Sequence, residues 1–248
     1  MEPQDQGKPV KKGKQMQDEE FTPTQVRRGI VITAGFIFLR LIAVRLLKNL
    51  FGSVDFQVSL KFTLFLFTVF LVMSVGLIYL GFTKWVGIDL SKWWFKRKRI
   101  RGDIGWGLVG LIFAGIIFIV SVVVAFVLLG LRPEALEAEK SQLPPLHLVP
   151  VWLILHLFFG FAIAAFQEET LFRGFWQIIF TERFGNWPGN ILQAALFSLA
   201  HIGLEPLDSL SMFLFLLLLR FGMGIVFGWL KMKRQTLLAP AIAHGIIG

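Results

Sequence analysis

The chain has 248 residues, of which 55% are hydrophobic, 15% are aromatic and only 17% are charged. Soluble domains carry about a quarter charged residues, so this composition excludes a soluble single domain, a disordered chain and a fibrous repeat. The apolar residues form long uninterrupted blocks of the length that crosses a bilayer as a helix. They do not alternate with polar residues as in a membrane barrel. The sequence therefore predicts an all-α, polytopic membrane protein.

The chain has a formal net charge of +9 and contains no cysteine. The basic residues lie between the apolar blocks, where they set membrane orientation and contact anionic lipid. We therefore expect membrane lipid as a partner and no nucleic acid. The absence of cysteine excludes a disulfide framework, a thiol nucleophile and a cysteine-ligated metal. The oligomeric state is not predicted.

In chain order, residues 1–25 are hydrophilic and predict a disordered cytoplasmic tail. Residues 26–147 form the N-terminal transmembrane helices with a basic cytoplasmic loop at 83–104, and residues 148–248 form a catalytic helical core. About seven spans are expected, and an eighth, surface or re-entrant helix at 85–101 is the alternative. The spans are 29–50, 59–82, 105–130, one that begins near Leu148, 189–203, 209–230, and one from Thr236 to the C-terminus.

The loop charges predict one orientation. Arg27 and Arg28 precede the first span, seven Lys or Arg residues lie in the 83–104 loop, and Lys231, Lys233 and Arg234 precede the last span. All three groups fall on the same side, which the positive-inside rule makes cytoplasmic. We expect an integral protein of the cell membrane, with its N-terminus and its active-site opening on the cytoplasmic side. Tryptophans 85, 93, 94 and 106 are interpreted as an aromatic belt.

Ionisable residues within apolar spans mark functional sites by default, because each costs several kcal/mol in a bilayer. The run Gln167-Glu168-Glu169-Thr170-Leu171-Phe172-Arg173-Gly174 is the richest. Glu169 and Arg173 are four residues apart, so they share a helix face and can pair. Glu168 points about 100° away from Glu169 and is free for another task. The alternative is that this run merely caps the span at the cytoplasmic surface.

Two later spans place histidines at a similar depth. His201 follows Gln193 and Phe197 at steps of four, and His244 lies one turn after Pro240. Counted at 1.5 Å per residue, Glu168, His201 and His244 lie roughly 20, 18 and 12 Å from the cytoplasmic ends of their helices. Arg40 and Arg220 fall in the same layer; pairing with Glu168 or Glu169 and snorkelling to the surface are both open to them. His156 is interpreted as a packing residue.

This convergence favours hydrolysis by an activated water. A carboxylate and an imidazole can remove a proton from water, and a second histidine can donate to an oxyanion. The sequence has no G-x-S-x-G and no H-E-x-x-H, so a serine hydrolase elbow and a standard zinc protease are unsupported. We expect no cofactor. A zinc ion held by Glu168, His201 and His244 is the alternative.

The three motifs resemble the CAAX protease and bacteriocin-processing (Abi) family of intramembrane proteases. That family shows E-E-x-x-x-R, then F-x-x-x-H, then H-x-x-x-N or D, and the likeness covers about residues 148–248. It implies an intramembrane endopeptidase acting on prenylated CAAX proteins or membrane peptides. By this resemblance Glu168 is the base, His201 holds the water and His244 belongs to the oxyanion site. Glu169 and Arg173 position the first motif, and Phe197 and Gln193 support substrate and oxyanion.

One position departs from the family pattern. The residue four after His244 is Gly248, where the family has Asn or Asp. Loss of one oxyanion donor costs about 10²–10³ in rate in other enzymes. Three readings stay open: a weakened enzyme, an enzyme with another donor such as Gln193, and an inactive member acting as a membrane scaffold or immunity protein. An ion-coupled transporter is a further, less favoured class.

Overall fold

The structure is a computed structural model that describes residues 21–51, 56–94, 99–132, 153–154, 157–158, 160–202 and 209–247. Every regular element in these ranges is helical, which confirms the predicted all-α fold. The α-helices are α1 (Pro23–Phe51), α2 (Phe56–Leu80), α3 (Leu90–Trp94), α4 (Ile100–Val127), α7 (Gln177–Phe184), α8 (Asn186–Leu199), α9 (Leu210–Arg234) and α10 (Leu238–Ile247); the π-helical segments are η1 (Gly81–Val86) and η4 (Gly160–Trp176).

Three described helices are long and apolar enough to cross a membrane. They are Thr68–Val86, Ile100–Val127 and Leu210–Arg234, and Leu238–Ile247 is a shorter apolar helix. These helices support an integral membrane protein, while the predicted number of seven spans stays a prediction. The predicted start of the fourth span near Leu148, and His156 within it, lie outside the described residues.

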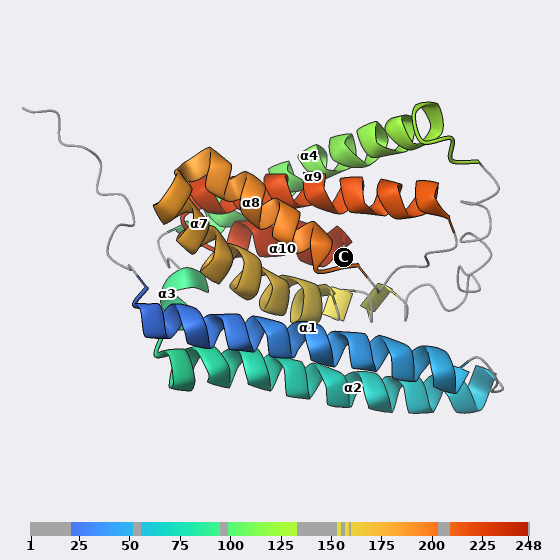
Figure 1. Ribbon diagram of the computed structural model, residues 1–248, viewed down its shortest axis with the longest axis horizontal. Coiled ribbons are helices and arrows are strands. Elements are labelled where there is room, and N and C mark those ends of the chain that lie inside the picture. Colours follow the sequence, from blue (N-terminus) through green and yellow to red (C-terminus); the bar gives the residue numbers. More distant parts are fainter. Residues whose placement is uncertain are drawn as a thin grey trace, which may run out of the picture.

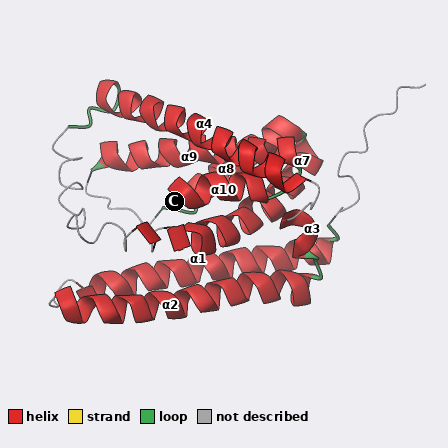
Figure 2. Ribbon diagram, turned by 180° about the vertical axis from the view of Figure 1, so that it is seen from behind, coloured by secondary structure: helices red, strands yellow, loops and turns green. Residues whose placement is uncertain are grey.

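The helices form a bundle with two outer pairs and a central group. Figures 1 and 2 show α1 and α2 side by side along one edge, and α4 and α9 along the opposite edge. The segment η4 and α10 lie between these pairs, and α8 packs on α9 and α7. Although the sequence analysis grouped α4 with the N-terminal helices, α4 packs on α9 and α10. Elements of the second half of the chain therefore pack against helices of the first half: α10 against α4, and η4 against α2.

The turn between α9 and α10 is fixed to the start of α4. Gln235 adopts a left-handed backbone conformation (φ 56°) that ends α9 and reverses the chain. The buried carboxylate of Asp103 accepts hydrogen bonds from Arg234 Nε at 2.7 Å and from Thr236 Oγ1 at 3.1 Å. These contacts set where α10 begins, and α10 carries His244.

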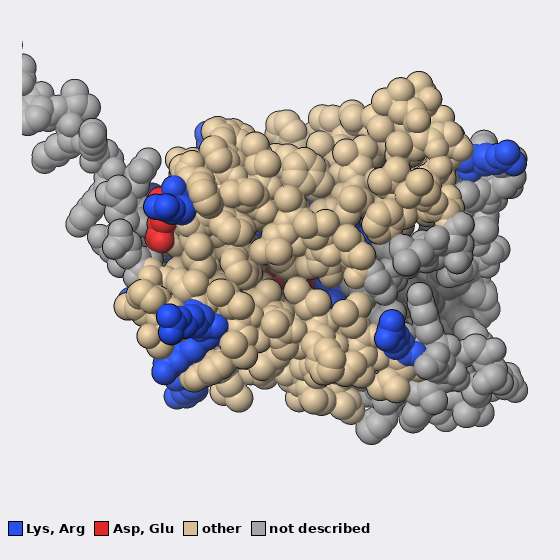
Figure 3. Space-filling view, viewed as in Figure 1, with Lys and Arg blue, Asp and Glu red and all other residues tan. Residues whose placement is uncertain are grey.

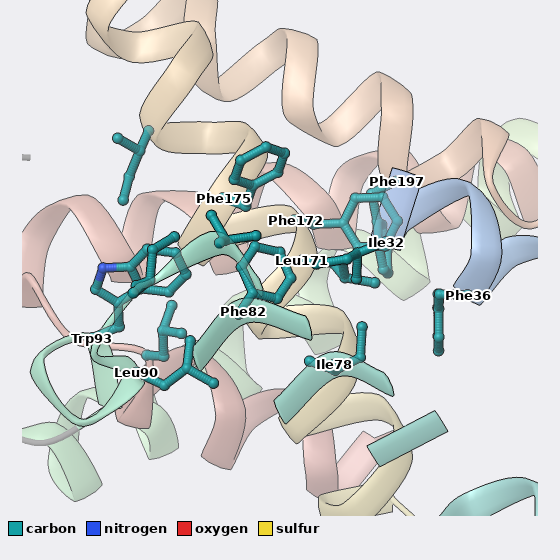
Figure 4. Packing of buried hydrophobic residues seen from close by; sticks show 14 residues of the cluster. Ile32, Phe36, Ile78, Phe82, Leu90, Trp93, Leu171, Phe172, Phe175 and Phe197 are labelled. Carbon is teal, nitrogen blue, oxygen red and sulfur yellow. The ribbon is translucent and has the colours of Figure 1, made fainter. Parts of the chain in front are cut away.

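An aromatic core joins η4 to the N-terminal helices. Figure 4 shows Phe82, Trp93 and Phe175 in this cluster, and Phe82 lies 5.4 Å from Phe175 between ring centroids. Trp93 is buried, and its carbonyl accepts the Leu237 amide at 2.8 Å. Trp93 therefore does not fit the predicted membrane-surface belt, because its indole fills space within the bundle. A side chain at Gly174 would lie 2.5 Å from Trp93 Cε3, so this close approach needs glycine.

Candidate active site

The segment η4 carries the acidic motif in the middle of the bundle. The sequence predicts one helix through this region, and the structure divides it into π-helical η4 and the short α7 that continues it. π-helical turns are uncommon and occur frequently at functional sites. The polar side chains of η4 are almost completely buried: Gln167, Glu168, Glu169, Thr170 and Arg173.

Glu169 forms a buried ion pair with Arg173, as predicted from their spacing. Arg173 Nη1 donates to Glu169 Oε1 at 3.0 Å, and neither side chain is exposed. The same carboxylate oxygen lies 2.7 Å from His244 Nδ1 of α10. Because an ionised carboxylate only accepts hydrogen bonds, this contact places the proton of His244 on Nδ1. Glu169 thus orients the ring and can stabilise a positive charge on it.

Glu168 shares His244 with Glu169 and has two further partners of its own, His201 and Arg40. Its Oε1 atom lies 3.7 Å from His201 Nε2, and its Oε2 atom lies 3.7 Å from His244 Nε2. Arg40 Nη1 of α1 donates to Oε1, which decides between the two roles left open for that arginine. Four elements therefore meet at one carboxylate.

His201 lies just beyond the end of α8, rather than within a continuing helix as the sequence analysis assumed. The helix ends at Leu199, and a turn places His201 Nδ1 2.8 Å from the Phe197 carbonyl. A carbonyl oxygen only accepts hydrogen bonds, so Nδ1 carries the proton and the neutral ring presents a lone pair at Nε2. That lone pair faces Glu168.

Two phenylalanines pack against the Arg173 guanidinium and against the two imidazole rings. Phe197 lies below the Arg173 guanidinium, with 4.3 Å from Cζ to the ring centroid, and meets His201 at 4.9 Å between ring centroids. Phe227 of α9 stacks on His244 at 4.8 Å with 24° between the planes. The motifs did not reveal Phe227, because a phenylalanine in an apolar helix gives no distinguishing signal. Its position, seventeen residues before His244, becomes meaningful only when α9 and α10 are packed together.

Gln193 binds α9 and its own helix. Its Nε2 atom donates to Asn190 Oδ1 at 2.9 Å and to the Gly224 carbonyl at 2.8 Å, so both amide hydrogens are engaged. The side chain is completely buried between α8 and α9. This geometry does not support the predicted oxyanion role and gives Gln193 a structural role in joining the two helices. Gly248 lies outside the described residues.

The cluster is accessible on one side. Arg40 is the most exposed of its charged side chains, at 22%, whereas Glu168 is at 2%. Figure 3 shows a small area of acidic and basic residues near the centre of the face, apart from the charged groups nearer its edges and over the region that η4 occupies in Figure 1. Among the described residues, no group of three His, Asp or Glu side chains has the arrangement of a metal site.

An all-helical bundle with apolar helices long enough to cross a membrane thus encloses a buried cluster of glutamates and histidines. Residues 150–248 match the sequence model of the family described as type II CAAX prenyl endopeptidase Rce1-like. The resemblance inferred from the three motifs is therefore confirmed over this part of the chain. No match was found among curated proteins or among solved structures.

Proposed function

We propose that the protein is an intramembrane endopeptidase that hydrolyses a peptide bond with water activated by Glu168 and His201. The observation that carries this proposal is the separation of 3.7 Å between Glu168 Oε1 and His201 Nε2. Both atoms are hydrogen-bond acceptors when Glu168 is ionised and His201 carries its proton on Nδ1. They cannot bond to each other, but one water can donate a hydrogen to each of them.

That water is poised to act as a nucleophile. Glu168 takes one proton, and the water oxygen forms a bond to the carbonyl carbon of the peptide while the C=O electron pair moves to the oxygen. When the tetrahedral intermediate collapses, the C–N bond breaks and the leaving nitrogen receives the proton from Glu168. The products are a carboxylic acid and an amine. No covalent enzyme intermediate is needed.

His244 is the group whose charge can change beside the intermediate. Its Nδ1–H group is held by Glu169 at 2.7 Å, and Glu169 is itself paired with Arg173. A carboxylate at this position stabilises an imidazolium. In its protonated form, His244 would present an N–H group at Nε2 to the developing negative charge. The family resemblance places His244 in the same role.

The zinc alternative uses Glu168, His201 and His244 as ligands. Glu168 already contacts the Arg40 guanidinium, and a permanent positive charge at that oxygen opposes a second cation there. We therefore favour catalysis without a metal. The two forms of the proposal differ in their response to a chelator.

The family name supports a substrate that carries a C-terminal prenyl group or a related membrane-bound peptide. We propose that such a substrate reaches the cluster from the membrane and that the site opens toward the basic, cytoplasmic loops. A bacteriocin leader fits the same chemistry. The scaffold reading is favoured by one observation, the glycine at 248.

The test is cleavage of a farnesylated CAAX peptide by the purified protein in detergent, with mass spectrometry of both fragments. We expect cleavage that is insensitive to a chelator and lost in Glu168→Gln. Cleavage that stops on chelation and returns with zinc would establish the metal form. A folded wild type that cleaves neither this peptide nor a panel of membrane peptides would contradict the proposal and favour the scaffold reading.

A further inference from the structure

Arg40 reaches the cluster from a part of the chain that the family comparison does not cover. It lies on α1, 128 positions before Glu168, and the family match begins only at residue 150. Nevertheless its Nη1 atom donates to the carboxylate that acts as base in the proposed mechanism. An arginine in an apolar helix is costly in a bilayer, so a contact of this kind calls for a functional explanation.

The guanidinium has more hydrogen-bond capacity than this contact uses. Arginine carries five N–H donors and stays protonated in proteins. Its contact with Glu168 engages one nitrogen, and Arg40 is the most accessible charged group of the cluster. Arg173 also has donors without a partner, at Nε and Nη2, but it is completely buried and is covered by Phe197 and Phe227. Arg40 is therefore better placed to meet a substrate.

The other donors considered for the oxyanion are engaged or missing. The two amide hydrogens of Gln193 bind Asn190 and Gly224. In its neutral form His244 carries its ring hydrogen on the nitrogen that faces Glu169, so it can donate from Nε2 only after it gains a second proton. Residue 248 is a glycine, which has no side-chain donor. Hydrolysis through a tetrahedral intermediate nevertheless needs a donor for the oxyanion.

We propose that Arg40 is a catalytic residue that donates a hydrogen bond to the oxyanion. This inference rests on the proposed function. As the water oxygen bonds to the carbonyl carbon, the carbonyl oxygen takes the electron pair, and an Arg40 N–H group binds it. When the C–N bond breaks, the electron pair returns and the hydrogen bond weakens. The arginine gives up no proton at any step.

A role in binding the C-terminal carboxylate of a CAAX peptide is the competing explanation. That carboxylate is three residues beyond the scissile bond, or roughly 10 Å in an extended chain. A residue in contact with the base lies instead within reach of the scissile carbonyl. The position of Arg40 thus favours the reacting atoms over the distant terminus.

The first test compares Arg40→Gln with Arg45→Gln in cleavage of the farnesylated peptide. Arg45 is on the same helix and is exposed, so its substitution makes the same change in charge away from the cluster. We expect kcat to fall about 10²–10³-fold in Arg40→Gln, with KM within threefold, and to be unchanged in Arg45→Gln. Arg40→Lys keeps the charge and should retain intermediate activity. A melting curve for each variant checks that the variant is folded.

A second test separates the transition state from the ground state. A phosphinic analogue of the peptide carries a tetrahedral anion where the oxyanion forms, whereas a reduced-amide analogue does not. Calorimetric titration of folded Arg40→Gln should show affinity for the phosphinic analogue reduced in parallel with kcat/KM. Its affinity for the reduced amide should be unchanged.

The outcomes distinguish this inference from the proposed function. An active wild type with kcat within threefold in Arg40→Gln would overturn the role of Arg40 and leave the protease in place. A rise in KM alone, removed by amidating the peptide C-terminus, would show that Arg40 binds the carboxylate instead and would also overturn it. A folded wild type that cleaves no peptide would overturn both.

Discussion

The segment η4 and helix α4 distribute polarity in opposite ways. In α4 the exposed side chains are large and apolar, such as Ile112 at 65% and Val127 at 73%. In η4 the buried side chains include charged ones, with Glu168 at 2% and Glu169 and Arg173 at 0%, beside apolar ones such as Phe175. A surface in contact with lipid gains nothing from burying apolar groups, while a charge exposed to lipid is costly. The candidate site is therefore indicated by the element that buries several charges together, since α4 buries the single residue Asp103.

A large effect on the cleavage rate is expected at His201, which lies 3.7 Å from Glu168 of η4. Its removal takes away one of the two acceptors that hold the water, so His201→Ala should lower kcat by about 10²–10⁴-fold. The melting temperature should change little, because only one ring contact and one hydrogen bond to Phe197 are lost. The matched control is His156→Ala, which should stay active. Equal activity in the two variants would contradict the assigned roles.

A smaller and different effect is expected at Asp103, the acidic residue of α4. It is completely buried like Glu169, but its partners are Arg234 and Thr236, at the turn before α10. Asp103→Asn should destabilise the fold by about 2 kcal/mol, because Arg234 loses its counter-charge. The loss is smaller than for a fully buried ion pair, since Arg234 is only partly buried and water screens its charge. Melting in detergent measures this loss. The cleavage rate per folded molecule should be close to that of wild type; a loss as large as that at His201 would make Asp103 part of the site.

The smallest effect distinguishes the two faces of α4 itself. A side chain added at Gly107 would lie 2.8 Å from Ile242 Cβ of α10, whereas Gly105 has no atom within 4 Å. Gly107→Ala should cost about 1–3 kcal/mol through overpacking. Gly105→Ala should be neutral or stabilise by up to about 1 kcal/mol, because alanine is the better helix former. Equal melting temperatures would show that α4 and α10 do not pack as described.

Much of the site could be predicted from the sequence because its chemistry depends on rare residues. Charges and histidines are few in apolar blocks, so Glu168, Glu169, Arg173, His201 and His244 were found from spacing and depth. The pairing of Glu169 with Arg173 follows from a four-residue step along one helix. These are local or compositional signals, and they do not need the tertiary structure.

The remaining features depend on packing between distant segments. Nothing in the sequence decides whether Arg40 meets Glu168 or the membrane surface, since both are compatible with its depth. Gln193 looks like a donor for the site until its neighbours Asn190 and Gly224 engage its amide. Phe227 has no signal at all before it stacks on His244. Likewise, the sequence pattern alone does not distinguish the π-helical turns of η4 from α-helical ones, because either kind of helix can bury the same apolar and small residues.

The most direct test of the account compares the two adjacent carboxylates in single-turnover cleavage of the farnesylated peptide. Glu168→Gln and Glu169→Gln make the same isosteric change, but only Glu168 is proposed to take a proton from water. We predict a loss of about 10⁴-fold in Glu168→Gln with peptide binding retained, and a smaller loss in Glu169→Gln, where His244 keeps a hydrogen-bond acceptor. A Glu168→Gln rate within tenfold of the wild-type rate would contradict the account.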